Sequence, residues 1–543
     1  MKLLKFSLLV VALGIGNFSN AQLYINGATF YIEAGATVTV QGDITSTNDI
    51  TGAGKVLLKG SSLQNVNMNG FTIPNLELDN VSNATLLTGN TKIGSTFLLT
   101  NGRFLTGAQD LILSPTATIT GQGTTRFVWT NGAGQLKKEL TGDVANFTLP
   151  VGENTNYRPA FLTTTGTTTG TFGVKVISGA SPNKPPMIAS YINTYWPITK
   201  TGMNGTVSLK GQYVDPSDIT GTEANLAGYF YDNTNWSSAS ETHDEVLNQV
   251  GAPIATNTGV LYGMNKFVAV GASAFLQEIY ISGTGLLTDA YRTPSLVIPT
   301  SDPYRTAEYI GAFPHVANPT TEVAAASVFN NQVSTNDDIA DWVFLQLRNT
   351  NASPGNTVLQ TRSALIKRNG NIVDIDGISP VTFNVTNGTY AISVRHRNHL
   401  GLSVNPTDGT APRTLSETQS IAFTTNAVDL RTITGTKLFG TAAGRTTSTH
   451  PILGTVNLLW GGNVNGDGTS KYIGPGNDRL ALLSDLGNVE GTILTVTSVN
   501  YRRGDLNYDK SVKYIGPGND RLYLLSTILS SVEGTIRTQE LPN

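Results

Sequence analysis

Short apolar stretches of about four residues recur through residues 22–134, and turn residues separate them. Thr37–Val40, Lys55–Leu58 and Asn75–Leu78 are rich in β-forming residues, and Gly42, Gly60 or Asn80 follows. Successive stretches begin about 9 to 20 residues apart, with no helical periodicity between them. This rhythm predicts a β-solenoid in which each turn buries its apolar side chains against the next. A β-sandwich is the alternative architecture.

The pattern lengthens after residue 134. In residues 135–276, apolar stretches such as Tyr191–Ile198 and Gly205–Tyr213 predict longer strands and a β-sandwich-like domain. Residues 277–440 contain alternating stretches, including Asp341–Arg348 and Tyr390–Arg397, and hairpin pairs such as Asn369-Gly370. They predict a second sandwich-like, adhesin-like domain. Residues 441–455 are expected to form a linker, which leaves 456–543 as a small helical module.

The first 21 residues have the form of a signal peptide. Lys2 and Lys5 precede the apolar stretch Leu8–Leu13, and Ser19-Asn20-Ala21 places small residues before a cleavage site at Gln22. The apolar stretch is too short to span a bilayer, and no later segment approaches the required length. We therefore expect a secreted or cell-surface protein without a transmembrane segment. An uncleaved N-terminal anchor is the alternative.

The overall composition excludes several function classes. The 35 basic and 38 acidic residues nearly balance, so no electrostatic field favours nucleic acid. The absence of cysteine excludes disulfides, thiolate zinc sites and cysteine nucleophiles. An exported chain without disulfides needs another source of order, and bound Ca²⁺ is one such source.

The C-terminal module contains a duplication. Lys471–Leu480 recurs letter for letter at Lys513–Leu522. Upstream of each copy, oxygen-bearing residues occupy positions 1, 3 and 5 of an EF-hand-type loop, and position 7 offers a backbone carbonyl. The predicted Ca²⁺ ligands are Asn463, Asn465, Asp467 and Thr469 in the first loop, and Asp505, Asn507, Asp509 and Ser511 in the second.

Both loops depart from the EF-hand pattern at position 12, where Gly474 and Gly516 replace a carboxylate. The acids come four residues later, at Asp478 and Asp520. We expect an enlarged loop that returns each aspartate to the ion, although a purely helix-capping role is the alternative. With three carboxylates against two, the second loop is expected to bind Ca²⁺ more tightly, despite the strain from Lys510 at position 6.

The duplicated module resembles a dockerin, which binds cohesin partners in polysaccharide-degrading assemblies. The K-Y-x-G-x-x-N-D-R insertion, together with Asp341-Trp342-Val343, Val394–Gly401 and Leu149–Gly152, is similar to Bacteroidetes surface proteins labelled hemagglutinin or adhesin. The resemblance implies a secreted, Ca²⁺-binding surface protein. Its partner would be a glycan or a cell-surface protein, and the module itself implies a cohesin-like partner. It supplies no catalytic residue.

Three other features suggest sites. Arg503-Gly504-Asp505 spells an integrin-type tripeptide, but Asp505 is already assigned to the second loop. If His396 and His399 lie on one strand they point to opposite faces and cannot share a zinc ion, so a structural or hairpin-end role is favoured. Trp236 lies in a polar segment and is the best candidate for an exposed sugar-stacking ring, with core packing as the alternative.

The sequence thus favours a non-enzymatic exported adhesin that binds carbohydrate or a surface partner. Its Ca²⁺-ordered module would either dock a partner or cap the preceding domain. One alternative is a β-helix polysaccharide lyase or glycosidase, which needs paired catalytic carboxylates. The available acids in the solenoid are scattered: Glu33, Asp43, Asp49, Glu77, Asp79 and Asp110. A purely structural matrix or filament component is a further alternative.

Overall fold

The computed structural model describes residues 22–167, 169–185, 188–237, 242–292, 295–330, 336–350, 356–385, 388–408, 410–411, 413–415, 427–440 and 443–542. The expected signal peptide, residues 1–21, lies outside them. The chain is mainly β and forms two compact units. The first comprises Met1–Ser181, Ile192–Ile219 and Thr242–Tyr262, and the second comprises Pro182–Tyr191, Thr220–Glu241 and Gly263–Asn543.

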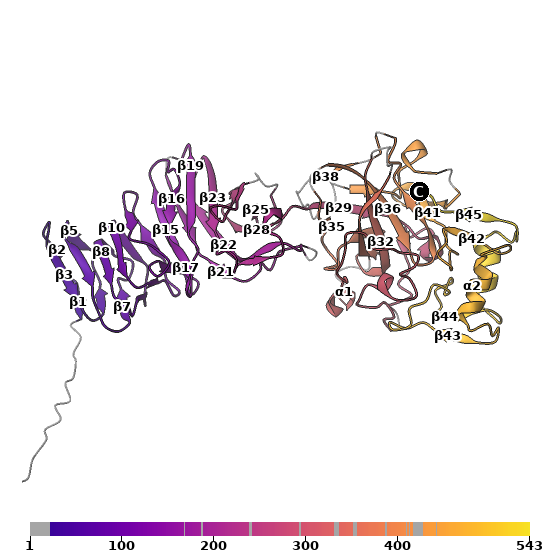
Figure 1. Cartoon of the computed structure of the whole chain (residues 1–543), viewed down its shortest axis with the longest axis horizontal. Coiled ribbons are helices and arrows are strands. Elements are labelled where there is room, and N and C mark those ends of the chain that lie inside the picture. The colour runs from indigo at the N-terminus through magenta and orange to yellow at the C-terminus, as the bar shows by residue number, and fades with distance from the viewer. Residues whose placement is uncertain are drawn as a thin grey trace, which may run out of the picture. The chain divides into compact units, whose positions relative to one another are not determined.

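The first unit opens with a β-solenoid of about six turns, whose stacked strands Figure 1 shows. One parallel ladder joins β1 (Leu23–Ile25), β4 (Ile44–Ser46), β7 (Gln64–Asn67), β9 (Ala84–Leu86), β11 (Phe104–Leu105) and β14 (Val128–Trp129). The other joins β3 (Thr37–Val40), β6 (Lys55–Leu58), β8 (Thr72–Asp79), β10 (Thr91–Asn101), β12 (Leu111–Leu113) and β15 (Leu136–Leu140). Strands β2 (Phe30–Ile32) and β5 (Ile50–Gly52) pair separately, and β13 (Thr118–Thr120) pairs with β10.

Columns of apolar side chains hold the turns of the solenoid together. Val56, Leu76, Phe97 and Ile119 occupy matching positions on neighbouring strands, and all four are buried. Full burial of each such side chain stabilises the fold by about 1.5–3 kcal/mol. The observed stacking confirms the predicted solenoid over the sandwich alternative for this region.

Polar side chains link adjacent turns at their corners. Asp49 accepts a 2.7 Å hydrogen bond from Thr72 N, 23 residues later, and Asn90 accepts one of 2.8 Å from Asp110 N. Gly102 has a φ of +82°, and a Cβ atom there would lie 1.9 Å from the Asn80 carbonyl oxygen. Glycine is therefore required where this turn passes against the previous one.

Antiparallel strands complete the first unit. Strand β15 pairs with β20 (Gly170–Val174), which pairs with β22 (Tyr191–Thr201). A second antiparallel sheet contains β16 (Phe147–Leu149), β19 (Ala160–Thr165), β23 (Thr206–Gln212), β27 (Gln249–Pro253) and β26 (Thr242–Asp244). The ring of Trp196 on β22 packs directly over Gly211 on β23. The sandwich-like architecture of 135–276 stays a prediction beyond these pairings.

The main sheet of the second unit has the order β35-β29-β34-β33-β32-β36-β37. Its strands are β29 (Val268–Ser273), β32 (Ile339–Arg348), β33 (Val358–Lys367), β34 (Asn371–Val373), β35 (Val381–Phe383), β36 (Gly388–His396) and β37 (His399–Ser403). Trp342 is fully buried, and its Nε1 donates to the Pro299 carbonyl at 2.8 Å. We call the part of this unit before residue 456 the β domain. Whether it is a sandwich stays a prediction.

The expected linker contains a strand. β40 (Arg445–His450), within 441–455, pairs with β41 (Gly454–Leu459) in a hairpin. Residues 445–450 are polar and none of them is fully buried, so their sequence carries little periodic signal. The remaining elements are β17 (Val151–Glu153), β18 (Asn156–Tyr157), β21 (Ile177–Ser178), β24 (Ile219–Thr220), η1 (Glu223–Asn225), β25 (Leu226–Tyr231), β28 (Thr258–Asn265), η2 (Gln277–Ile279), β30 (Tyr280–Ile281), β31 (Leu286–Leu287), η3 (Pro303–Arg305), α1 (Ala326–Asn330), β38 (Arg413–Leu415), β39 (Ala427–Asp429) and η4 (Gly435–Lys437).

Two short helices mark the C-terminal module, residues 456–543. They are α2 (Asp478–Asp485) and α3 (Asp520–Tyr523), the latter continuing as a π-helix, η5 (Leu524–Ile528). Strand β42 (Thr469–Lys471) pairs with β45 (Ile536–Thr538), and β43 (Ile493–Thr495) pairs with β44 (Ser511–Lys513). Within the described residues, none of the helices is long and apolar enough to cross a membrane.

The C-terminal module and the β domain share one hydrophobic core. Leu482 and Leu524 belong to the same buried cluster as Leu402 of β37. Close to the C-terminus, Glu540 N donates to the Gly401 carbonyl at 2.8 Å, and Arg348 Nη1 donates to the Pro542 carbonyl at 3.0 Å. The module therefore packs on the domain before it rather than standing apart.

Candidate functional site

Asp478 closes the first loop. Its Oδ1 accepts hydrogen bonds from Val464 N at 2.7 Å and Asn465 N at 3.2 Å, and its Oδ2 accepts one from Lys471 N at 2.9 Å. The carboxylate thus returns to the start of the enlarged loop, as the sequence predicts. Asn477 caps helix α2 instead, by accepting from Leu480 N at 3.0 Å.

Asp520 closes the second loop with the equivalent bonds. Its donors are Leu506 N at 2.8 Å, Asn507 N at 3.4 Å and Lys513 N at 2.8 Å. Asn519 caps α3 by accepting from Leu522 N at 2.8 Å. A role for Asp478 and Asp520 as helix caps alone is therefore wrong, because the preceding asparagine caps each helix.

The other predicted ligands of the first loop bond the backbone of the loop itself. Asn463 Oδ1 accepts from Gly468 N at 3.2 Å, and Asn465 Oδ1 accepts from Asp467 N at 3.0 Å. Asp467 Oδ1 accepts from Thr469 N at 2.7 Å. These oxygens of positions 1, 3 and 5 therefore each hold an amide of the loop, and Asn463 is buried whereas Asp467 is exposed.

The second loop contains a buried carboxylate oxygen that has no hydrogen-bond donor. Asp505 Oδ2 accepts from Tyr291 Oη at 2.7 Å and from Lys510 N at 3.0 Å, whereas Oδ1 is buried and has no hydrogen-bond donor. Asn507 Oδ1 accepts from Asp509 N at 3.0 Å, and Ser511 begins β44. A buried carboxylate oxygen without a donor is costly unless a cation satisfies it.

Burial raises the pKa values of the enclosed carboxyl groups. It raises the pKa of Asp520 to about 8, with a further contribution from the charge of Asp505, and it raises that of Asp505 to about 6. Burial also raises the pKa of Asp478 to about 7. A divalent cation would offset the desolvation and mutual repulsion of these groups, so the donor set fits a hard ion such as Ca²⁺.

Within the described part of the chain, no group of three or more His, Asp or Glu side chains is arranged to hold a metal, so Asp505, Asp509 and Asp520 do not form a ready-made carboxylate cluster. Tyr508 and Lys510 of the second loop have φ values of +61° and +66°. Glycines occupy the equivalent positions of the first loop, so the second loop carries the backbone strain expected for Lys510.

A hairpin tip of the β domain inserts between the two loops. Asn398, in the turn between β36 and β37, accepts from Asn463 N at 3.2 Å through its backbone carbonyl. Its Nδ2 donates to the carbonyls of Arg503 and Asp505, each at 3.2 Å. Asn398 thus contacts position 1 of both loops. We call Arg397 and Asn398 the hairpin tip.

Arg397 is the buried centre of this contact. Its guanidinium lies 4.7–4.9 Å from the ring centroids of Tyr291, Tyr501 and Tyr508. Its Nη1 donates to the Arg502 carbonyl at 2.6 Å, and its Nε lies 3.4 Å from Asp341 Oδ2. No local sequence pattern identifies Arg397, because its partners come from three segments distant in sequence.

The expected hairpin-end role of His396 and His399 fits the structure, but their expected placement along one strand is wrong. The chain turns between them, so they are paired across a hairpin and not spaced along one strand. Their Nδ1 atoms lie 2.9 Å apart. Both rings are buried.

Two other suggested sites are inaccessible. Arg503 and Asp505 of the Arg-Gly-Asp tripeptide are buried, so they offer no surface to a receptor. Trp236 is 1% exposed, and its Nε1 donates to the Asn183 carbonyl at 3.1 Å. The proposal of an exposed Trp236 ring is therefore wrong, because packing against Tyr229 and Tyr231 buries it.

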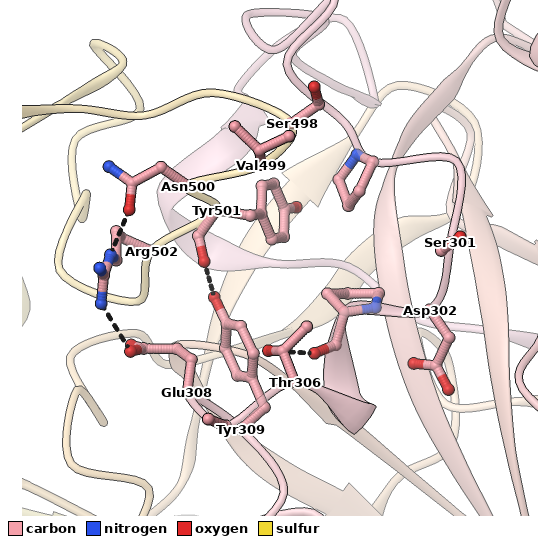
Figure 2. A pocket seen from close by; sticks show the side chains of 13 residues that line it. Ser301, Asp302, Thr306, Glu308, Tyr309, Ser498, Val499, Asn500, Tyr501 and Arg502 are labelled. Atoms are coloured by element: carbon pink, nitrogen blue, oxygen red, sulfur yellow. Dashed lines mark hydrogen bonds and ion pairs between the residues drawn. The ribbon is translucent and has the colours of Figure 1, made fainter.

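A pocket of about 650 Å³ lies where the C-terminal module meets the β domain. Figure 2 shows Arg502 between Asn500 and Glu308, and Tyr309 beneath the Tyr501 carbonyl. Arg502 Nη1 lies 2.9 Å from Glu308 Oε2, so these opposite charges satisfy each other. The walls add Pro299, Pro303, Ala307, Val499 and the hydroxyls of Ser301, Thr306 and Ser498.

The duplication also produces matched apolar surface. Ile473 and Ile515 are each 44% exposed, and Leu480 and Leu522 are 50% and 54% exposed. Ile493 and Ile536 are 60% and 62% exposed. The neighbouring Tyr472 and Tyr514 are buried, and the Arg479 and Arg521 guanidinium groups lie over their rings. We call the six exposed residues the paired apolar surface.

No family model, curated protein or solved structure matches the chain.

Proposed function

We propose that this chain is a non-enzymatic, exported surface binding protein of the adhesin type, hemagglutinin-like, with a C-terminal module that Ca²⁺ orders. The observation that carries the proposal is the paired apolar surface. Three pairs of equivalent residues keep nearly equal exposure even though the buried side chains of the module share a core with the β domain. Exposed apolar groups that recur in this way are typical of a recognition surface.

Calcium is proposed on the chemistry of the second loop. Asp505 Oδ1 is a buried acceptor without a donor, and Asp509 and Asp520 belong to the same loop. Ca²⁺ prefers six to eight oxygen ligands, which these carboxylates and the loop carbonyls supply. The first loop is proposed as a weaker site, because Asn463 replaces the first carboxylate.

Capping and docking involve different residues of the module. Asp505 and Tyr508 face the β domain, whereas Ile473 and Ile515 do not belong to the shared core. We therefore propose that the module caps the domain and also presents its paired apolar surface to a protein partner, cohesin-like in kind. The pocket beside Tyr501 is the proposed place for a carbohydrate ligand, because Trp236 is buried.

The polysaccharide-degrading alternative is less favoured by the solenoid carboxylates. Glu77 bonds Lys55 and Thr100, and Asp79 bonds Lys59 and Asn101. Asp43, Asp49 and Asp110 accept hydrogen bonds from backbone amides of the next turn. Acids used to join turns are poorly placed for acid–base catalysis on a substrate.

The proposal is tested with the full chain in Ca²⁺ on a glycan array and on a polysaccharide panel. We expect glycan binding that Ala307→Trp, within the pocket, reduces at least about tenfold while the exposed control Ala325→Trp does not; tenfold corresponds to about 1.4 kcal/mol. Release of reducing sugars or unsaturated products would instead favour the enzyme. If neither variant changes glycan binding, the carbohydrate site lies outside the pocket.

A further inference from the structure

Four buried side chains form a continuous polar chain behind the hairpin tip. Asp341 Oδ2 lies 3.1 Å from His396 Nε2, the two Nδ1 atoms lie 2.9 Å apart, and His399 Nε2 lies 2.5 Å from Glu278 Oε2. None of the four side chains has solvent exposure. The chain joins β32, both strands of the hairpin and η2, and the proposed function does not use it.

The positions of the protons follow from hydrogen-bond chemistry. Each Nε2 lies within ion-pair distance of a carboxylate oxygen without an aligned hydrogen bond to it, and we place a proton on each Nε2 because two facing lone pairs would repel. If both rings were neutral, each Nδ1 would then present a lone pair, and two lone pairs 2.9 Å apart repel. One of the two Nδ1 atoms must carry a proton, so one of the two rings is an imidazolium.

The local charges place that extra proton on His399. Asp341 has Arg397 nearby and accepts from Tyr501 Oη. Glu278 has His399 as its sole ion-pair partner among the described residues, and both its oxygens are buried. A buried carboxylate without a cation is strongly unfavourable, so His399 is the ring that balances it.

We propose that the facing Nδ1 atoms of His396 and His399 share one proton, which makes His399 the cation opposite Glu278, and that a second proton on this pair releases the hairpin tip from the C-terminal module. Two adjacent imidazolium rings beside Arg397 would place three positive charges against two carboxylates. The hairpin tip would then separate from the carbonyls of Arg502, Arg503 and Asp505 that it binds.

Other charged and titratable groups face the pair from each packed element. Asp341 and Glu278 come from β32 and η2, and Arg397 comes from the tip itself. From the module, Tyr501 and Tyr508 face Asp341 and Asn398, while Tyr523 and Arg537 experience the charge of Glu278. Acidification therefore adds positive charge to a site in which Asp341 and Glu278 already have cationic partners.

The direction of the pH effect follows from His396. Burial lowers its pKa from 6.5 to about 4, so the unfolded or undocked chain binds a proton that the docked form excludes. The stability that depends on neutral His396 is present above pH 6.5 and is lost as the pH falls towards 4. The expected loss at pH 4 is on the order of a hundredfold in the docking equilibrium.

The proton assignment is tested by ¹⁵N NMR of the histidine side chains in the full chain at pH 7. We expect one ring, His399, to be protonated on both nitrogens, and expect Glu278→Gln to abolish that signature while the exposed control Glu245→Gln leaves it. Two neutral rings would overturn the proposal. So would a stoichiometric transition metal, found by elemental analysis after incubation with Zn²⁺, because a metal would then be the shared cation.

Release of the tip is tested by hydrogen-exchange protection factors of amides 501–510 at pH 7 and pH 4 in the presence of Ca²⁺. We expect wild-type protection to fall by about two orders of magnitude, and His396→Gln, which cannot take the second proton, to keep most of it. Equal loss in both proteins would overturn the release step. The wild-type NMR result stands independently if His396→Gln fails to fold.

Discussion

Tyr291 Oη donates a 2.7 Å hydrogen bond to Asp505 Oδ2, which joins the β domain to position 1 of the second loop. The two residues are 214 positions apart in sequence. This bond fixes one oxygen of the carboxylate and leaves the other for a cation. Folding of the β domain therefore prepares the proposed metal site.

Replacing Tyr291 by phenylalanine is expected to destabilise the second unit by about 1–3 kcal/mol, because a buried carboxylate oxygen loses a donor. Urea unfolding measures the change. The control is Tyr280→Phe, whose hydroxyl bonds the Thr449 carbonyl at 3.3 Å at an exposed position, and whose loss is expected to cost under about 1 kcal/mol. Equal costs for the two variants would contradict a special role for Tyr291.

The second loop is expected to bind Ca²⁺ more tightly than the first. Asp509→Asn should therefore weaken the tighter of two calorimetric binding events, and Asp467→Asn should weaken the other, because affinity follows carboxylate number. Isothermal titration of the full chain after chelation gives both constants. Loss of the tighter event in Asp467→Asn would reverse the order, and binding unaffected by either change would remove the metal from these loops.

Calcium binding is expected to release protons at pH 7. The pKa of Asp520 is raised to about 8 and that of Asp478 to about 7, so the cation-free carboxyls are largely or half protonated, and a bound cation requires the ionised form. Affinity should weaken as the pH falls from 8 to 5. Titrations in buffers of different ionisation enthalpy count the protons. Asp520→Asn should lower that number, and a buffer-independent enthalpy would contradict the prediction.

Replacing Arg397 by methionine is expected to cost about 3–5 kcal/mol, because it leaves Asp341 buried without its guanidinium partner. The same variant should weaken Ca²⁺ binding, since the tip holds the Asp505 carbonyl through Asn398. Denaturant melts with and without Ca²⁺ measure both effects. Arg126→Met in the solenoid serves as the control and should leave the Ca²⁺-dependent shift intact.

A solenoid turn provides a test in the first unit. Gly102→Ala should destabilise the first unit by more than about 1 kcal/mol, because the residue has φ +82° and its new Cβ would meet the Asn80 carbonyl. Gly142→Ala is the matched control, since no atom lies within 4 Å of its Cβ position. Thermal unfolding distinguishes the two variants. An unchanged melting temperature for Gly102→Ala would show that the turn can shift without loss of stability.

The fold was most predictable where the signal is local. Stretches such as Lys55–Leu58 have the length and turn residues of solenoid strands, and the spacing from Asn463 to Asp478 is enough to predict a loop closed by its last aspartate. A hairpin-end role for His396 and His399 could be expected, but their direct pairing could not, because Arg397-Asn398 lacks the glycine that marks the Asn-Gly and Asp-Gly hairpins of this domain. Arg397 and Trp236 depend on neighbours that only the tertiary fold brings together, so no local pattern identifies them.

The pairing of Glu540 with Gly401 bears on synthesis of the chain. The β domain cannot complete its core until residues near position 540 have left the ribosome, because Leu402 remains uncovered before then. A chain that stops before these residues is expected to expose an apolar surface to proteases. Synthesis of the C-terminal module is in this way built into the stability of the second unit.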